Sequence, residues 1–336
     1  LSQSLMVLSL LPLFFIEIEK FSMAMAIILA IHNIFVATQD VATDALAADS
    51  LNTESLGKAN GLMWGSKVFG RGIGMSVSVA IYLSYGVSAG LLILMAMISL
   101  IMLIPYLSKE LNHKVGKQQD TAQNNRMPFK QLFYEIVSGF SSKIAFWALI
   151  FMIVSNIGAG IYDVLFNKFF IEELAWTGEQ IATARPWGLW IGGVAGLLVG
   201  FGVSFFGARY LLLGFITAEL FLYLFLGIVN TQITMMEGFL VLVGVEIVTV
   251  SSQVIMFALL MSLCVTKTSA TNFGIYMGLS NLSTLIGSKI APVSFAALGY
   301  SGSFILSAVV LIPCLLIIPI LTSSNRKNFK LFFQPD

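Results

Sequence analysis

The feature that most constrains this chain is a succession of apolar runs, each long enough to cross a lipid bilayer. A helix rises 1.5 Å per residue, so about 20 apolar residues span a hydrocarbon core of roughly 30 Å. The ten runs, of which the first is short, lie at 1–16, 23–48, 61–85, 87–107, 144–166, 186–206, 210–229, 236–265, 270–298 and 301–321. With 57% hydrophobic and only 10% charged residues, the chain cannot form the surface of a soluble domain. It is predicted to be an all-α polytopic membrane protein.

A polar stretch divides these runs into four and six. We expect an N-terminal helical half at 1–107, a linker at 108–143 that ends in a helix at 128–137 lying on the membrane surface, a six-helix half at 144–322 and a tail at 323–336. The loops on the linker's side of the membrane carry twelve Lys and Arg residues, whereas those on the other side carry three. The linker and C-terminus are therefore predicted to be cytoplasmic. The membrane is expected to be the inner one.

Charged residues lie inside two of the N-terminal runs. Gln39, Asp40 and Asp44 fall in the second run, and Lys67 and Arg71 fall in the third. The four-residue spacing places the two acids on one face of their helix and the two bases on one face of the next helix. If the chain turns between the runs, Asp40 and Arg71 each lie roughly 15 Å from the turn, which predicts a pair at one depth. Both a structural lock and a polar cavity for substrate or protons fit this pattern, because a charge at the membrane centre needs a partner or water.

Four more charged residues lie well inside the later runs, and they differ in their surroundings. Asp163 follows the glycine-rich segment 156–160, which favours a bendable helix and a functional role for the acid. Glu246 lies about ten residues into its run, so a protonatable role and a neutral, hydrogen-bonded carboxyl both remain open. Glu219 and Lys289 are interpreted as side chains that reach the interface from helix ends.

One run carries glycines at strict four-residue intervals, at Gly188, Gly192, Gly196 and Gly200. Such a stripe lets another helix approach closely. We therefore expect a packing seam here rather than a substrate site.

Motifs of enzymes are missing from the sequence. It contains no nucleophile elbow, no Walker loop and no metal-ligand spacing, and it has only two histidines. Cys264 and Cys314 both fall in apolar runs and are expected to be small core residues. The net charge of +1, with the basic residues in loops, does not favour a nucleic-acid partner. We expect neither a metal nor a cofactor.

Four short segments resemble one family, the major facilitator superfamily, in its muropeptide permease (AmpG) and acetyl-coenzyme A transporter branch. They are Gln-Asp-Val-Ala-Thr-Asp-Ala at 39–45, the glycine-flanked Arg71, Tyr162-Asp163 with the later segment 174–181, and Ser-Ala-Thr-Asn-Phe-Gly at 269–274. The resemblance implies twelve helices in two six-helix halves around one central site. About ten of the twelve would be present, with the missing pair expected before Leu1 in an N-terminally truncated chain.

The resemblance implies a secondary active transporter, a proton-coupled symporter of a muropeptide-like or acyl-coenzyme A-like solute that works by alternating access. Asp40 and Asp44 are then candidates for proton and gate chemistry, Lys67 and Arg71 for counter-charges or substrate binding. Asp163 and Glu246 are the polar contribution of the C-terminal half. The expected partners are a small-molecule substrate, protons and the lipid bilayer, and the expected state is a monomer.

Three other functions remain open. Residues 41–46 and 62–65 also resemble the folate and biopterin transporters. A non-transporting membrane sensor of the same fold would keep its polar residues in structural pairs. A membrane-embedded acyltransferase would need a histidine and an acid facing one cavity, for which His32 and Asp40 are the available pair.

Overall fold

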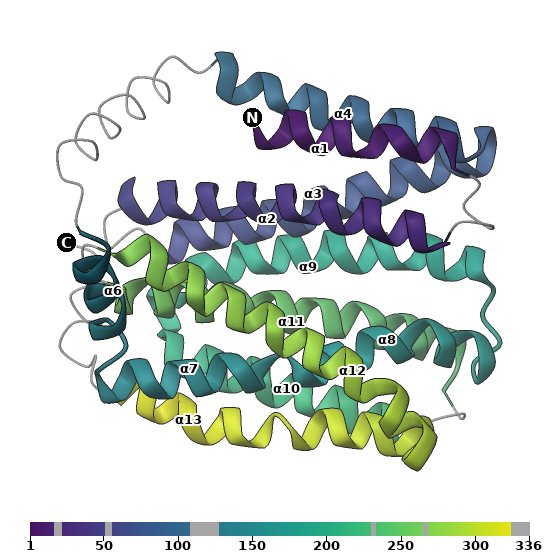
Figure 1. Cartoon of the computed structure of the whole chain (residues 1–336). Coiled ribbons are helices and arrows are strands. Elements are labelled where there is room, and N and C mark those ends of the chain that lie inside the picture. The colour runs from purple at the N-terminus through teal and green to yellow at the C-terminus, as the bar shows by residue number, and fades with distance from the viewer. Residues whose placement is uncertain (17–21, 51–55, 108–127, 230–232, 265–267, 324–336) are drawn as a thin grey trace. The chain divides into compact units, whose positions relative to one another are not determined.

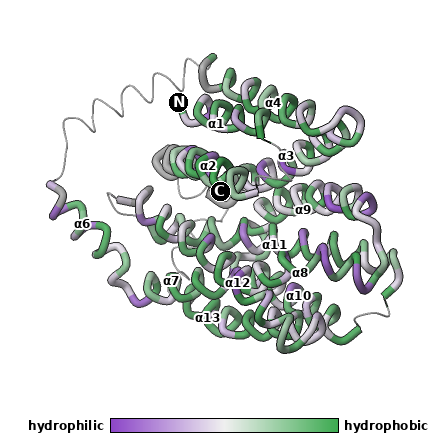
Figure 2. Tube along the Cα trace, turned by 45° about the vertical axis from the view of Figure 1, so that its right-hand side comes forward, coloured by the Kyte–Doolittle hydropathy of each residue, from purple (hydrophilic) through white to green (hydrophobic). Residues whose placement is uncertain are grey.

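The structure, a computed structural model, describes residues 1–16, 22–50, 56–107, 128–229, 233–264 and 268–323, and these are folded almost entirely into α-helices (Figure 1). Each of the ten predicted spans contains a helix. Seven described helices or helix runs are long and apolar enough to cross a membrane. Hydrophobic residues predominate in the helices, with hydrophilic positions scattered among them (Figure 2). The predicted fold class, all-α and polytopic, is confirmed.

The first half of the chain begins with a short helical segment and continues with three longer helices. Their bounds are α1 Ser2–Leu10, η1 Leu11–Phe15, α2 Ser22–Ser50, α3 Leu56–Tyr85 and α4 Val87–Leu107. A helix follows at α6 Phe129–Ser138, where the sequence predicts one at 128–137. Most of the predicted linker, residues 108–127, and the tail from 324 onward lie outside the described residues.

The second half holds the remaining helices. They are α7 Lys143–Ser155, α8 Ile157–Glu172, α9 Gly178–Phe206, α10 Ala208–Val229, α11 Met235–Leu263, α12 Ser269–Val309 and α13 Ile312–Ser323. Helix α12 is two helices joined at Gly299, whose backbone angles (φ 67°, ψ −167°) are open to glycine and strained for other residues. This bend (Figure 1) separates the predicted spans 270–298 and 301–321.

Contacts divide the chain into two compact units. The first unit holds Leu1–Ala47 and Gly74–Tyr134, and the second holds Ala48–Ile73 and Glu135–Asp336. This grouping differs from the predicted halves in where Ala48–Ile73 falls. Within the second unit, Trp64 of α3 stacks on Phe257 of α11 with ring centroids 4.7 Å apart.

The core of the second unit is aromatic. Its largest fully buried side chains include Tyr223, Phe169, Phe151, Phe257, Phe273, Tyr276 and Phe304. Phe169 of α8 meets Phe304 of the second half of α12 edge to face, with centroids 5.1 Å apart. Offset and edge-to-face rings of this kind add to the stabilisation that burial provides.

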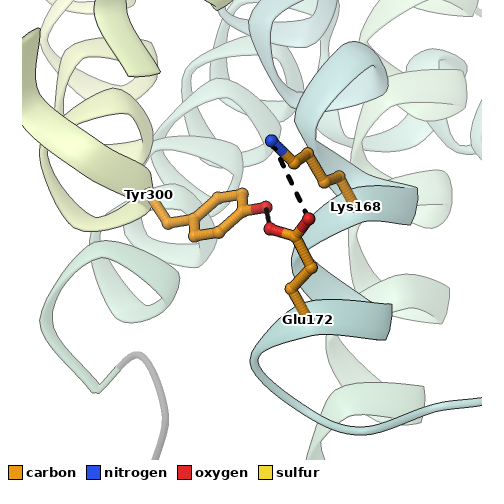
Figure 3. Close-up of polar contacts among 3 residues, drawn as sticks. All are labelled: Lys168, Glu172 and Tyr300. Atoms are coloured by element: carbon orange, nitrogen blue, oxygen red, sulfur yellow. Dashed lines mark hydrogen bonds and ion pairs between the residues drawn. The ribbon is translucent and has the colours of Figure 1, made fainter. Parts of the chain in front are cut away.

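Helices α8 and α12 pack closely because small residues line their seam. A Cβ at Gly160 would overlap Thr284 O, and one at Gly287 would overlap Ile157 O. At the C-terminal end of α8 the Tyr300 hydroxyl donates a 2.6 Å hydrogen bond to Glu172, whose other oxygen lies 3.8 Å from Lys168 Nζ (Figure 3). The same two helices are thus joined by small residues in the middle and by polar contacts at one end.

Helices α7 and α8 are separated by a break at Asn156. The side-chain amide of Asn156 donates to Ser280 Oγ at 2.8 Å, and its backbone N–H donates to Ser283 Oγ at 3.0 Å. Both serines belong to α12. The sequence predicts a bendable helix from the glycines of 156–160; the structure places a break at Asn156, while Gly158 and Gly160 serve close helix packing.

The first unit is packed more sparsely. Helix α1 lies against α4, where Ser4 Oγ donates to Met102 Sδ at 3.2 Å. No part of the spanning stretch Ser22–Thr43 of α2 is buried, and only 6% of the spanning stretch of α4 is buried.

Candidate functional site

An ion pair joins two membrane helices of the second unit. Nη2 of Arg185 on α9 lies 3.4 Å from Oδ1 of Asp163 on α8. The Arg185 side chain is 20% exposed and that of Asp163 is 53% exposed. The guanidinium also lies over the ring of Phe166, 5.5 Å from its centroid. Asp163, a predicted site residue, therefore has a cationic partner that sequence reasoning did not identify.

Arg185 was missed because the predicted span begins at Pro186. The structure begins α9 at Gly178, with Thr177 as N-cap and Gln180 closing a capping box: Thr177 N–H donates to Gln180 Oε1 at 2.8 Å, and Gln180 N–H donates to Thr177 Oγ1 at 3.2 Å. The Thr-Gly-Glu-Gln sequence at 177–180 is the signal that could have placed Arg185 about 12 Å inside the helix.

Glu246 lies where the glycine stripe of α9 meets α11. A Cβ at Gly188 would lie 3.1 Å from Glu246 Cγ, and one at Gly192 would lie 3.1 Å from Glu246 O. Side chains at these positions would displace the glutamate, so the glycines make room for a half-buried carboxyl. The predicted packing seam is confirmed, and Gly196 extends it against Val250.

Lys67 and Arg71 are exposed side chains on the part of α3 that belongs to the second unit. The Lys67 Nζ lies 5.1 Å from the centroid of Trp64, one turn earlier. Arg71 and Arg185 both lie within electrostatic range of Asp163 and of Glu246. Two acids and two arginines from four helices therefore share one polar region of this unit.

The predicted acids of α2 belong to the first unit. Helix α2 spans Gln39, Asp40 and Asp44. Asp40 is half-buried, and the side chain of Asp44 lies outside the described residues. The oxygen Oε1 of Gln39 is shielded from solvent and accepts no hydrogen bond from the described residues. Because Asp40 and Arg71 belong to different units, their pairing stays a prediction.

His32 is engaged by α1. Its Nδ1 lies 3.0 Å from Ser9 Oγ and 3.2 Å from Met6 O. Asp40 follows eight residues later on the same helix, about 12 Å along its axis, too far for a direct hydrogen bond. The histidine and acid that an acyltransferase would need therefore do not form a dyad.

Glu219 lies at a different depth from the one that the sequence predicts. It is 4% exposed and lies in the middle of α10, so the interpretation as an interfacial side chain is wrong. Tyr223 Oη donates to Glu219 Oε1 at 3.0 Å, and Thr249 Oγ1 of α11 donates to the same oxygen at 3.5 Å. At ten or more residues from either end of α10 the side chain is too deep to reach the interface, and the two hydroxyl groups replace water.

This arrangement is suited to binding charged solutes and to moving protons. A guanidinium held by a carboxylate can exchange that partner for an anionic substrate, and the carboxylate can accept a proton when the partner leaves. Among the described residues, no group of three or more His, Cys, Asp or Glu side chains could hold a metal ion.

Comparison with known proteins agrees with these features. The chain belongs to the Major Facilitator Superfamily, which it matches over residues 1–288. It is therefore a transporter of the permease type, with several helices that cross the membrane. The chain is 27% identical over 302 residues to the protein named "Putative transporter AmpG 1" of Rickettsia bellii (strain RML369-C), covering 86% of this chain and 71% of the relative. The predicted resemblance to the AmpG branch is confirmed, and the family indicates transport rather than enzymatic activity.

Proposed function

We propose that the protein is a proton-coupled symporter of the inner membrane that moves an organic anion, muropeptide-like or acyl-coenzyme A-like, by alternating access. The observation that carries the proposal is the set of Arg71, Asp163, Arg185 and Glu246, two acids and two bases within membrane helices of one unit. Ionisable side chains at such positions are costly and mark substrate and proton pathways. The similarity to the protein named "Putative transporter AmpG 1" supports a transport function.

Coupling in this proposal depends on competition for Arg185. While Asp163 is ionised it holds the guanidinium at 3.4 Å. A proton on Asp163 removes that attraction and frees the guanidinium for a substrate anion. Loss of the proton re-forms the pair and releases the anion. Asp40 and Asp44 are the corresponding proton and gate residues of the N-terminal half.

The two helical halves, 1–107 and 144–322, are proposed to rock around the substrate, with the linker and the C-terminal tail in the cytoplasm. The transporter is proposed to work as a monomer. Sidedness is testable with cysteines at Ser141, beside the start of α7, and at Glu173, just after α8. In intact cells a membrane-impermeant thiol reagent should label Glu173→Cys and not Ser141→Cys. The opposite labelling would reverse the orientation.

Transport itself is tested in vesicles that contain the protein. We expect an imposed pH gradient, acid outside, to drive accumulation of a labelled muropeptide or acyl-coenzyme A. Uptake of a labelled pterin alone would indicate a folate-type transporter. The absence of uptake from the whole panel would leave a non-transporting sensor.

The role of Asp163 is separated from simple folding by a matched control. Asp163→Asn should insert normally and exchange substrate across the membrane, yet fail to accumulate it against a gradient. Glu237→Gln is the control, because the exposed Glu237 caps α11 through Thr234 and glutamine caps equally well. Accumulation by Asp163→Asn at the level of the control would remove Asp163 from the proton pathway.

The predicted pair of Asp40 and Arg71 has its own test. If the pair is structural, Asp40→Asn should lower the amount of folded protein, and adding Arg71→Gln should restore it by neutralising both charges. If Asp40 also carries protons, the double variant should fold and still fail to accumulate substrate. Full accumulation by the double variant would reduce Asp40 to a structural residue.

A further inference from the structure

A lysine lies within an apolar face of α12. The exposed Lys289 lines a shallow hollow of about 400 Å³ together with Leu282, Leu285, Ile286, Ile290 and Val293. Lys289 is thus the one polar side chain in this lining. Within the described part of the chain, no carboxylate lies at ion-pair distance from it.

The depth of Lys289 argues against an interfacial role. From Ser269 to the bend at Gly299 the helix has a length of roughly 45 Å, more than the hydrocarbon core of about 30 Å. If the helix is centred in the membrane, Lys289 lies about 7 Å from the midplane and as far again from the nearer edge. Side chains on a helix lean toward its N-terminus, which here directs the lysine toward the midplane and away from that edge.

The neighbouring helix places a carboxylate at the same depth, but that carboxylate is engaged. Helices α8 and α12 run alongside each other, with Gly160 against Gly287 and Lys168 Nζ 4.3 Å from the Phe295 centroid. This register puts Asp163 at the level of residue 290, one position along α12 from Lys289. Asp163 is paired with Arg185, so it does not serve as the counter-charge of Lys289.

We propose that Lys289 binds the anionic group of the transported solute. The ammonium would hold a carboxylate or phosphate oxygen, and the apolar hollow around it would hold the adjoining apolar part of an amphipathic molecule. This inference rests on the proposed transport function and names the residue that recognises the charge of the solute. An ammonium without a counter-charge at this depth is costly unless an anion or water accompanies it, and a bound solute supplies the anion.

Uptake by the intact transporter tests the proposal with two forms of one probe, a labelled muropeptide with free carboxyl groups and the same muropeptide with amidated ones. Lys289→Met should fold normally and take up the free acid about tenfold or more slowly than wild type, since a charge-assisted contact is lost. Its uptake of the amide should equal that of wild type. Lys289→Arg should retain most of the preference for the acid. A labelled acyl-coenzyme A forms a second arm that tests a phosphate in place of a carboxylate.

Lys168→Met is the matched control, because Lys168 pairs with Glu172 at the end of α8. It should leave the preference for the acid unchanged. If Lys289→Met keeps the wild-type preference, Lys289 does not bind the anion and the inference is wrong, although transport is intact. If wild type itself transports no probe, the proposed function fails first.

Chemical rescue provides a test that does not depend on comparing folding levels. Lys289→Cys treated with 2-aminoethyl methanethiosulfonate forms a disulfide with release of methanesulfinate, which restores an ammonium group at nearly the length of lysine. Uptake of the free acid should recover, and methyl methanethiosulfonate, which adds no charge, should not restore it. Wild type is the background, since Cys264 and Cys314 are buried. A cysteine at 289 that reacts with neither reagent would face lipid and would overturn the proposal.

Discussion

Helices α4 and α11 show that equally apolar segments can be used in different ways. Both are long and hydrophobic enough to cross a membrane, yet 6% of the spanning stretch of α4 is buried within the protein, against 61% of that of α11. Helix α11 packs against α9 and α10 on two sides, whereas α4 packs mainly against α1. Lipid is as apolar as leucine, so an exposed face costs little in the membrane. Hydropathy therefore decides whether a helix spans, and shape decides whether it packs.

The polar groups also differ between the first unit, which holds α4, and the second unit, which holds α11. In the second unit, Glu219 and Asn156 are buried; Glu219 accepts a hydrogen bond from a neighbouring helix and Asn156 donates one to another. In the first unit, the hydrogen bond between His32 and Ser9 is only partly buried. We expect substitutions in the second unit to cost more than matched substitutions in the first.

The largest expected difference comes from truncation of an aromatic core residue. Phe304→Ala, at a fully buried position, should lower the free energy of unfolding by about 3 kcal/mol or more because it leaves a cavity. Leu100→Ala on α4, 67% exposed, should change it by less than about 0.5 kcal/mol. Unfolding of purified protein by sodium dodecyl sulfate measures both. Equal losses would mean that the two regions are packed alike.

Filling a helix seam should have a somewhat smaller effect. Gly160→Ala places a methyl group against Thr284 O and should cost about 1–3 kcal/mol. Gly74→Ala in α3 would place its methyl group more than 4 Å from the described residues outside its own helix backbone and chain neighbours, and should gain up to about 1 kcal/mol from helix propensity. The same unfolding titration distinguishes them. A neutral Gly160→Ala would show that the seam can open without loss.

Removal of a buried hydrogen-bond acceptor is expected to cost no more than filling the helix seam. Glu219→Ala leaves the hydroxyls of Tyr223 and Thr249 without their partner and should cost about 1–3 kcal/mol. Glu219→Gln keeps an oxygen in place and should cost less than about 1 kcal/mol. Ser9→Ala is the comparison in the first unit, at about 1 kcal/mol or less. If glutamine proves as damaging as alanine, the charge of Glu219 matters and not only its oxygen.

The smallest effect is expected at the end of α8. Lys168→Met removes an ion pair in which both side chains are 49% exposed (Figure 3), and should change stability by less than about 0.5 kcal/mol. Hydrogen exchange of the last turn of α8 measures local stability there. Loss of protection throughout α8 and α12 would contradict the prediction and show that this contact holds the two helices together.

Some residues of the candidate site could be recognised in the sequence because a charge within an apolar run is costly whatever its neighbours are. Asp163, Glu246 and Arg71 stand out as charges within apolar runs, whatever their partners are. Arg185 did not, because a proline beside it suggested a helix start that the capping box places eight residues earlier. Glu219 stood inside a span, but its depth was misjudged, and the hydroxyl from α11 that satisfies it comes from a residue 30 positions away.

The sequence by itself determined that this is an all-helical membrane protein, because the length and polarity of each span are properties of consecutive residues. The Major Facilitator Superfamily was indicated separately, by the resemblance of four short segments. Only the tertiary structure decided what surrounds each carboxylate. Arg185 pairs with Asp163, and Tyr223 and Thr249 donate hydrogen bonds to Glu219. Glu246 lies against the glycines of α9. The physical reason is that a helix fixes only the face on which a side chain lies. What that face meets depends on the packing of helices far apart in the chain, and in a membrane close packing by small residues, rather than hydrophobicity, determines that choice.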